Sequence, residues 1–250
     1  MDHVARITIN RPERRNAMSF DVMRKLGEAV DRVAKENSVN VAVLTGAGDR
    51  AFSAGADLTG MSEGDSLIDA HQARGLLADL FRSLWRLEKP SIARVRGFAL
   101  AGGFGLAMAC YFLIASEDAQ FGTHEIYVGL WPYMITVPLL RSMPQRFALE
   151  LMATGRRVDA DEAARIGFVN RVVPTGDLDA SVDELANTLA AKSPLILGWG
   201  KRSFYQALEM EPDAALDYLQ SMLTLTSLSR DSAEGIAAFV EKRRPQWHGR

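Results

Sequence analysis

The sequence contains little of the chemistry on which metal and disulfide proteins depend. Its 250 residues include a single cysteine, Cys110, which excludes an internal disulfide and a site built from several cysteines. The histidines lack the spacing of metal ligands; they are His3, His71, His124 and His248. No metal site is therefore predicted, and Cys110, which lies in an apolar stretch, is interpreted as a buried structural residue.

A strong charge bias and a long apolar run are also missing. The formal net charge is −2 and the pI is about 6.1, so no basic surface for nucleic acid is expected. The longest apolar run, near residues 106–115, is too short to span a bilayer, and the first residues lack the pattern of a signal peptide. We expect a cytoplasmic protein without nucleic-acid or membrane partners, and its 48% of hydrophobic residues can form a sizeable core.

Short β-branched runs alternate with helical patterns over most of the chain. The runs predicted as strands are 4–10, 41–46, 91–97, 111–116 and 168–173. Ser19 is predicted to cap one helix, and apolar residues spaced by about 3.6 predict another over 66–88. Toward the C-terminus the pattern is almost wholly helical. We expect an α/β body over 1–190 and a helical part over 191–250.

Capping signals mark two further helices. Asp159 and Glu162 have the spacing of a capping box, and Gly167 is predicted to end the helix that they begin. Asp231 and Glu234 repeat this spacing near the C-terminus, which predicts a helix that starts there.

Two motifs of known enzymes occur in incomplete form. Residues 46–51 match the G-x-G-x-x-A fingerprint of dinucleotide-binding proteins, but the required helix does not follow. Ser53, in AFSAG, lacks the first glycine of a nucleophile elbow and the helix that should come after it. A turn and an ordinary loop serine are the preferred interpretations, which argues against a nicotinamide dehydrogenase and a serine hydrolase.

Two segments rich in small residues each follow a predicted strand. One is GGFG at 102–105, which opens an apolar helical run, and the other is FSAGADL at 52–58. Glycines also permit close packing of a helix on a strand. A free backbone N–H at a helix N-terminus, however, stabilises a developing negative charge without any charged side chain. Together the segments predict an oxyanion hole with two backbone donors.

The chain resembles the crotonase superfamily, also called the enoyl-CoA hydratase/isomerase family. The resemblance rests on ordered motifs at 7–19, 41–58, 89–110, 119–132, 151–174 and 237–243. It implies an α/β fold of the ClpP/crotonase type, a spiral of β-β-α units with a helical C-terminal trimerisation region. It further implies homotrimers or hexamers, an acyl-CoA thioester substrate, and no cofactor other than the coenzyme A of that substrate.

The resemblance also assigns site residues. It implies that the backbone N–H groups of Ala54 and Gly102 form the oxyanion hole. The residues that it places against the substrate or coenzyme A are Ala54, Gly55, Ala56, Asp57, Leu58, Gly102, Gly103, Phe239 and Lys242, the last two reaching a neighbouring subunit. An alternative for Lys242 is a solvated residue of a basic tail.

The sequence departs from the family at its catalytic residues. Hydratases of the family carry two glutamates; the second corresponds to Glu125, but the first corresponds to Gly105. Two carboxylates can hold and deprotonate a water molecule, whereas one can still move a proton between two carbons. This favours a Δ3,Δ2-enoyl-CoA isomerase in which Glu125 is the acid and base. If Glu125 lies among apolar side chains, its pKa should be raised.

Two other functions stay open. A hydratase would need another group beside Glu125, and the candidates are Tyr133, Glu63 and Asp65. A non-catalytic acyl-CoA-binding protein would need neither.

The segment 130–138 is bulkier than the glycine-rich segment of many hydratases. It contains Trp131, Tyr133 and Met134, which either shape the acyl pocket or belong to the core. Isomerases of the family also tend to be bulky and apolar near this point, which adds mild support to the prediction of an isomerase.

Overall fold

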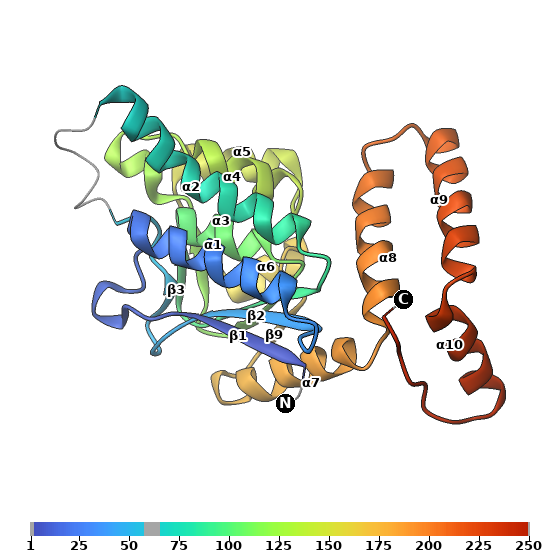
Figure 1. The fold of residues 1–250 in the computed structure, drawn as a ribbon. Coiled ribbons are helices and arrows are strands. Elements are labelled where there is room, and N and C mark those ends of the chain that lie inside the picture. Colours follow the sequence, from blue (N-terminus) through green and yellow to red (C-terminus); the bar gives the residue numbers. More distant parts are fainter. Residues whose placement is uncertain (1–2, 58–65, 250) are drawn as a thin grey trace.

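The computed structural model of the chain describes residues 3–57 and 66–249. Leu58, Glu63 and Asp65, which the sequence analysis names as candidates, lie outside the described residues. Two sheets and a layer of helices form an α/β body, and the last helices extend away from it (Figure 1).

The larger sheet has the order β1-β2-β4-β6-β9, and all of its strands are parallel. Its strands are β1 (Val4–Ile9), β2 (Val41–Gly46), β4 (Ser91–Val95), β6 (Phe112–Ser116) and β9 (Arg171–Val173). These are the five predicted runs, and the predictions overran the strands by up to three residues at their ends. β2 is buried at every position, as a parallel strand covered on both faces requires.

The second sheet consists of short strands that the sequence analysis did not predict. They are β3 (Ala51–Ser53), β5 (Phe98–Leu100), β7 (Gln120–Gly122) and β8 (Arg157–Asp159), of which only the β7–β8 pair is antiparallel. Runs of three residues carry too little periodicity to be recognised. Each of the first three follows a strand of the larger sheet, so the chain alternates between the two sheets and produces the predicted β-β-α spiral.

Most of the helices pack in or around the body, and the last ones extend away from it. They are α1 (Phe20–Lys35), α2 (Leu67–Arg86), α3 (Gly102–Ala109), α4 (Tyr133–Leu140), α5 (Gln145–Thr154), α6 (Ala160–Ile166), α7 (Leu178–Ala190), α8 (Pro194–Ala207), α9 (Pro212–Ser227) and α10 (Arg230–Val240). Short 3₁₀ helices occur as η1 (Pro12–Arg14), η3 (His124–Val128) and η4 (Thr175–Asp177). Among the described helices none is long and apolar enough to cross a membrane.

Most capping predictions are confirmed, and one is wrong. Ser19 Oγ accepts the Val22 N–H, and Asp159 caps α6 by accepting the Glu162 N–H at 2.8 Å. α10, however, begins after Ser229 and not after Asp231. Asp231 is buried in its first turn and accepts hydrogen bonds from Ser193 Oγ and from the backbone of the C-terminal tail. A long-range network therefore overrides the local capping-box signal.

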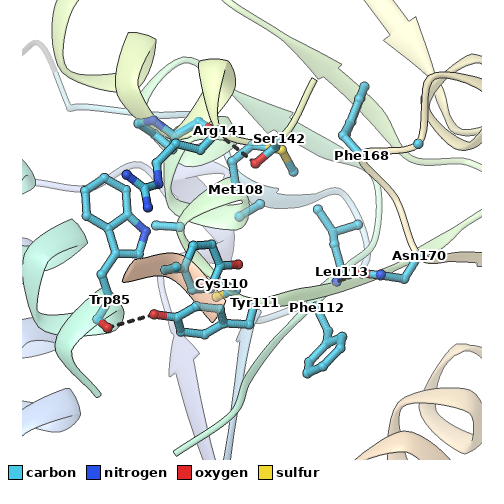
Figure 2. Close-up of a pocket in the computed structure, with 15 residues that line it drawn as sticks. Trp85, Met108, Cys110, Tyr111, Phe112, Leu113, Arg141, Ser142, Phe168 and Asn170 are labelled. Atoms are coloured by element: carbon cyan, nitrogen blue, oxygen red, sulfur yellow. Dashed lines mark hydrogen bonds between the residues drawn. The ribbon is translucent and has the colours of Figure 1, made fainter. Parts of the chain in front are cut away.

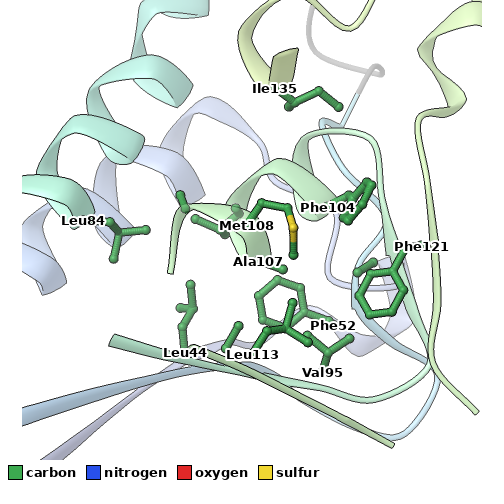
Figure 3. Packing of buried hydrophobic residues seen from close by; sticks show 14 of the residues in the cluster. Leu44, Phe52, Leu84, Val95, Phe104, Ala107, Met108, Leu113, Phe121 and Ile135 are labelled. Carbon is green, nitrogen blue, oxygen red and sulfur yellow. The ribbon is translucent and has the colours of Figure 1, made fainter. Parts of the chain in front are cut away.

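Helix α3 lies in the middle of the body and is buried along its whole length. It is apolar on all sides, as a helix surrounded by core must be. Figure 3 shows Phe104 and Met108 of α3 among side chains from both sheets and from α2 and α4. The Phe104 ring packs on Phe121 and Phe168 with centroid distances of 5.4 and 5.5 Å. The start of α3 is thereby held rigidly, which fixes the position of its N-terminal amides.

The C-terminal helices differ from the body in what they bury. α8, α9 and α10 stand apart from the two sheets in Figure 1, and α9 has no buried residue. Large apolar side chains are exposed on these helices and at the C-caps of α8 and α9: Phe204, Leu208, Leu216, Leu219, Leu223, Leu225, Leu228, Ile236, Phe239 and Val240. An exposed apolar surface of this extent is typical of an interaction surface.

Candidate active site

The N-terminus of α3 presents a backbone donor without an acceptor. β5 leads into the helix through Ala101, whose φ of 50° and ψ of −130° are unfavourable for a residue with a Cβ. Such a conformation costs on the order of 1–3 kcal/mol, and it clusters at functional sites. Across residues 3–57 and 66–249 the Gly102 N–H meets no acceptor, whereas the Gly105 N–H donates to Ala101 O at 3.1 Å. The positive end of the helix dipole adds to the Gly102 donor.

The end of β3 supplies a second backbone segment at the same place. A Cβ on Gly55, whose φ is +95°, would lie 3.2 Å from the Gly102 nitrogen and 2.8 Å from Ala101 Cβ. Gly55 is therefore required for the two backbones to approach each other. Paired parallel strands, β3 and β5, bring together two segments that are about fifty residues apart in the sequence.

The predicted second oxyanion donor, Ala54, needs correction. Its N–H donates to Arg15 O at 3.0 Å and is therefore occupied. The next amide, of Gly55, donates to Ser53 Oγ at 3.2 Å. The Ala56 N–H is different, because no acceptor for it exists among the described residues. The donor available beside Gly102 is thus two residues further along the same motif.

The other small residues of the two motifs have packing roles. A Cβ on Gly103 would lie 2.4 Å from Ser53 O, so this glycine lets α3 pack directly on β3. Asp57 receives a hydrogen bond from Arg11 at 3.0 Å, and its N–H donates to Met18 O at 2.9 Å. These contacts hold the segment after β3 in place.

Glu125 lies on η3 and is half-buried. Burial raises the pKa of its carboxyl group to about 7, and a hydrogen bond to its own backbone N–H opposes this only in part. Its Oε2 atom is buried and has no hydrogen-bond partner in the part of the chain that the structure describes. This confirms the expected raised pKa. A buried carboxyl group with a free oxygen and a pKa near neutrality is suited to act as both acid and base.

The neighbouring histidine does not contact that carboxylate. The His124 ring accepts a hydrogen bond from Arg157 Nε at 3.4 Å and packs on Tyr127 at 5.5 Å between centroids. Burial, and then the charge of Arg157, lower the pKa of His124. His124 therefore belongs to the surroundings of η3 and is not placed as a partner of Glu125.

The position of the missing first glutamate is filled by apolar side chains. A Cβ on Gly105 would lie only 2.3 Å from Ile135 Cγ2 and 3.0 Å from Phe81 Cζ. Real Cβ atoms do not approach other atoms so closely, so no larger side chain fits at residue 105 without a movement of Ile135. Neither side chain could be recognised from the sequence, because each occupies an ordinary apolar position of a helix. Only the fold places them against Gly105.

The bulky segment at the start of α4 contributes side chains both to the core and to the surface. Trp131 is half-buried and packs on the main core. Tyr133 is 76% exposed, and its hydroxyl makes no hydrogen bond to the described residues. Phe239, at 86% exposed, and Lys242 are also at the surface of the single chain. The structure thus brings Ala56 and Gly102 together, but not the C-terminal residues predicted to bind coenzyme A.

A separate cavity lies at the opposite end of α3. It has a volume of about 220 Å³ and is lined by residues that include Trp85, Met108, Tyr111 and Arg141, as Figure 2 shows. The Tyr111 hydroxyl donates to Trp85 O at 2.7 Å. None of the predicted catalytic or substrate-binding residues lines this cavity. In the described residues no three His, Cys, Asp or Glu side chains are grouped as metal ligands.

The β-β-α spiral, the two backbone donors and the half-buried carboxyl group of Glu125 are together consistent with the crotonase fold. A crystal structure of enoyl-CoA hydratase from Mycobacterium smegmatis superposes with a TM-score of 0.93 at 35% identity, covering 98% of this chain and 95% of that one. This likeness shows the fold.

The particular family follows from the sequence comparisons. The family model described as enoyl-CoA hydratase/isomerase matches residues 1–250, and the chain belongs to this family. It is 35% identical to the short-chain-enoyl-CoA hydratase of Clostridium acetobutylicum over 96% of this chain and 92% of the relative. It is 37% identical to a carnitinyl-CoA dehydratase of Salmonella typhi over 99% and 95% of the two chains. The predicted family and fold class are therefore confirmed.

Proposed function

We propose that this protein moves the double bond of a 3-enoyl-CoA to the 2 position through a thioester enolate. The Glu125 carboxylate removes a proton from C2, and the negative charge passes to the thioester oxygen. Glu125, now protonated, returns the proton to C4. The reaction only moves a proton within the substrate, so the proposal includes no metal or redox cofactor.

The enolate oxygen is bound in this proposal by the N–H groups of Gly102 and Ala56. Within the described residues neither donor has an acceptor, and the close approach of Gly55 to Gly102 supports their acting on one atom. One donor of this kind typically contributes roughly 2.7–4 kcal/mol to transition-state stabilisation. The neighbouring residues Gly55 and Asp57 are proposed to lie along the coenzyme A moiety.

The observation that carries the choice of isomerisation is the packing at Gly105. Hydration needs a group besides the Glu125 carboxylate to position the water. Ile135 and Phe81 occupy the space at residue 105 where the family's first glutamate would stand, which leaves an apolar wall there and Glu125 as the single acid and base of the proposal. An apolar wall excludes water and favours return of the proton to carbon.

Water addition to a 2-enoyl-CoA is the second candidate, and the comparisons favour it. The names of several relatives specify hydratases, including a 2,3-dehydroadipyl-CoA hydratase of Escherichia coli at 35% identity. In that case a group other than residue 105 must position the water. Tyr133 is the described candidate, but its exposed hydroxyl argues against it in the isolated chain.

The deciding experiment compares two substrates. Purified protein is incubated separately with a 3-enoyl-CoA and a 2-enoyl-CoA, and products are identified by mass and by thioester conjugation. A conjugated product of unchanged mass from the first substrate supports isomerisation, and a gain of one water by the second supports hydration. Glu125→Gln is the matched control, because it keeps the size of the side chain and removes its acid–base function. If that variant turns over normally, the mechanism is wrong; binding without turnover by the wild type would indicate an acyl-CoA-binding protein.

We also propose that the active protein is a homotrimer or a hexamer built from trimers. The exposed apolar side chains of α9 and α10 support an interface there, and Phe239 and Lys242 would reach coenzyme A only in a neighbouring subunit. Light scattering after size exclusion should give three or six times 27.5 kDa. A monomer at micromolar concentration would contradict the proposal.

A further inference from the structure

Lys201 on α8 lies on the border between two cavities of different chemistry. One has a volume of about 380 Å³ and is lined mainly by apolar and aromatic residues, including Phe112, Leu197 and Phe204. The other has a volume of about 750 Å³ and is lined by charged residues, including Arg86 and Arg141. Lys201 lines both, so a molecule with an apolar end and an anionic end can lie across its ammonium group.

The Lys201 nitrogen contacts a ring and a backbone carbonyl, and among the described residues it forms no ion pair. Nζ lies 3.9 Å from the centroid of the Tyr111 ring and makes a long hydrogen bond, of 3.5 Å, to Lys89 O. Glu88, which lines the same cavity, pairs instead with Arg202 at 3.4 Å. Figure 2 shows Tyr111 with Trp85 and Arg141 at the neighbouring wall.

Burial of Lys201 between the two cavities favours the neutral amine. Burial lowers the pKa of Lys201 to about 7, and the charge of Glu88 raises it only in part. The charged and titratable groups that line the same cavity or contact the Nζ are Arg86, Glu88, Lys89, Tyr111, Arg141, Arg202, Tyr205 and Glu209. A desolvated lysine of this kind is a nucleophile at neutral pH, whereas an ordinary lysine is protonated.

We propose that Lys201 is an acylation site that accepts acyl groups from acyl-CoA thioesters. Its Nζ lone pair attacks the thioester carbonyl carbon, and the C–S bond breaks as the tetrahedral intermediate collapses. The proton lost from Nζ goes to the departing thiolate, so the products are an N-acyl-lysine and free coenzyme A. The acyl chain lies in the apolar cavity, and the arginine-rich cavity takes the phosphates.

The other lysines provide internal standards. Lys25 forms an ion pair with Asp21 at 2.7 Å, and Lys89 donates to two backbone carbonyls at 2.6 Å each. In both lysines the nitrogen is therefore engaged in short contacts, whereas Lys201 makes only a long one. The acyl donor is an acyl-CoA thioester, the ligand class proposed for the active site. The acylation of Lys201, however, does not use Glu125.

The test measures acylation at each of the six lysines by peptide mass spectrometry. Full-length protein is incubated with acetyl-CoA between pH 6 and pH 9. Lys201 is expected to react at least about tenfold faster than Lys35 and Lys192 at pH 7.5, because more of it is neutral. Its rate should level off above about pH 8, whereas the rates of ordinary lysines should rise about tenfold per pH unit. Equal rates, or a steady rise at Lys201, would overturn the proposal.

Three variants and a second donor sharpen the result. Lys201→Arg should remove the fast site while the other lysines react unchanged. Tyr111→Phe, which keeps the ring, should react like the wild type. Glu125→Gln should acylate at the wild-type rate, so a failure of the proposed isomerase mechanism is distinguishable from a failure here. Butyryl-CoA should prefer Lys201 over Lys35 more strongly than acetyl-CoA does; the same preference for both donors would exclude the apolar cavity as the acyl site.

Discussion

Positions 105 and 125 belong to the same proposed site, but the fold treats them in opposite ways. At residue 125 burial raises the pKa of a half-buried carboxyl group to about 7, and one of its oxygens has no hydrogen-bond partner among the described residues. At residue 105 there is no side chain, and Ile135 and Phe81 pack where one would stand. The packing around residue 105 therefore leaves no room for a glutamate side chain, whereas the fold keeps a half-buried carboxyl group at residue 125.

The largest expected effect comes from removing the carboxylate at residue 125. Glu125→Gln should lower kcat by roughly 10² to 10⁴-fold, the usual contribution of a positioned acid–base group, and should leave the affinity for a non-reactive acyl-CoA almost unchanged. Steady-state kinetics and calorimetric titration measure the two quantities. A loss of less than tenfold would mean that the difference between the two positions is not one of catalysis.

The same substitution should change how stability depends on pH. The pKa of Glu125 is raised in the folded protein to about 7, so between about pH 4.5 and pH 7 the folded state binds more protons than the unfolded state. Stability therefore falls as pH rises through this range, and the cost of the buried charge is complete above pH 7.

Glu125→Gln removes this cost, which is on the order of 3 kcal/mol at pH 8. The variant should be more stable than the wild type at pH 8 and nearly equal to it at pH 4.5. Thermal unfolding at the two pH values measures the difference. A constant difference at both would show that the carboxyl group is not desolvated.

Adding a methyl group at residue 105 should destabilise the fold. Gly105→Ala places a Cβ against the branched side chain of Ile135, and overpacking of this kind costs on the order of 1–3 kcal/mol. The matched control is Gly75→Ala in α2, where a Cβ meets no atom within 4 Å and helix propensity should stabilise by about 0.5–1 kcal/mol.

Combining Gly105→Ala with Ile135→Ala should recover part of the loss, because the second change makes room for the first. Chemical denaturation of the single and double variants measures this coupling. If the two effects simply add, the two residues do not compete for the same space, and the argument against a carboxylate at residue 105 fails.

The smallest effect is expected at Tyr133. Its hydroxyl is exposed and unbonded within the described chain, so Tyr133→Phe should change kcat/KM by less than about twofold under the single-carboxylate mechanism. A loss of hydration activity in this variant, with isomerisation preserved, would show that Tyr133 supplies the group that Gly105 lacks.

Local signals predicted the parts of the structure that depend on nearby residues. The long strands, the caps at Ser19 and Asp159 and the stop at Gly167 follow from β-branched runs, side-chain oxygens and glycine conformation within a few residues. The resemblance of ordered motifs predicted the family and directed attention to Glu125 and Gly102. Three-residue strands carry no periodic signal, so the second sheet was not foreseen.

The tertiary structure decided which groups of those motifs are free to act. The Arg15 carbonyl oxygen, in a turn distant in the sequence, accepts the hydrogen bond of the Ala54 N–H. Among the described residues the donor without an acceptor is therefore on Ala56. Asp231 does not cap α10, because its carboxylate accepts hydrogen bonds from Ser193 and from the C-terminal tail. Hydrogen bonds and packing between distant segments depend on where the whole chain passes, and no motif of a few residues contains that information. The sequence by itself determined the family and the carboxyl group; the fold determined its environment, the available amides and the closed space at Gly105.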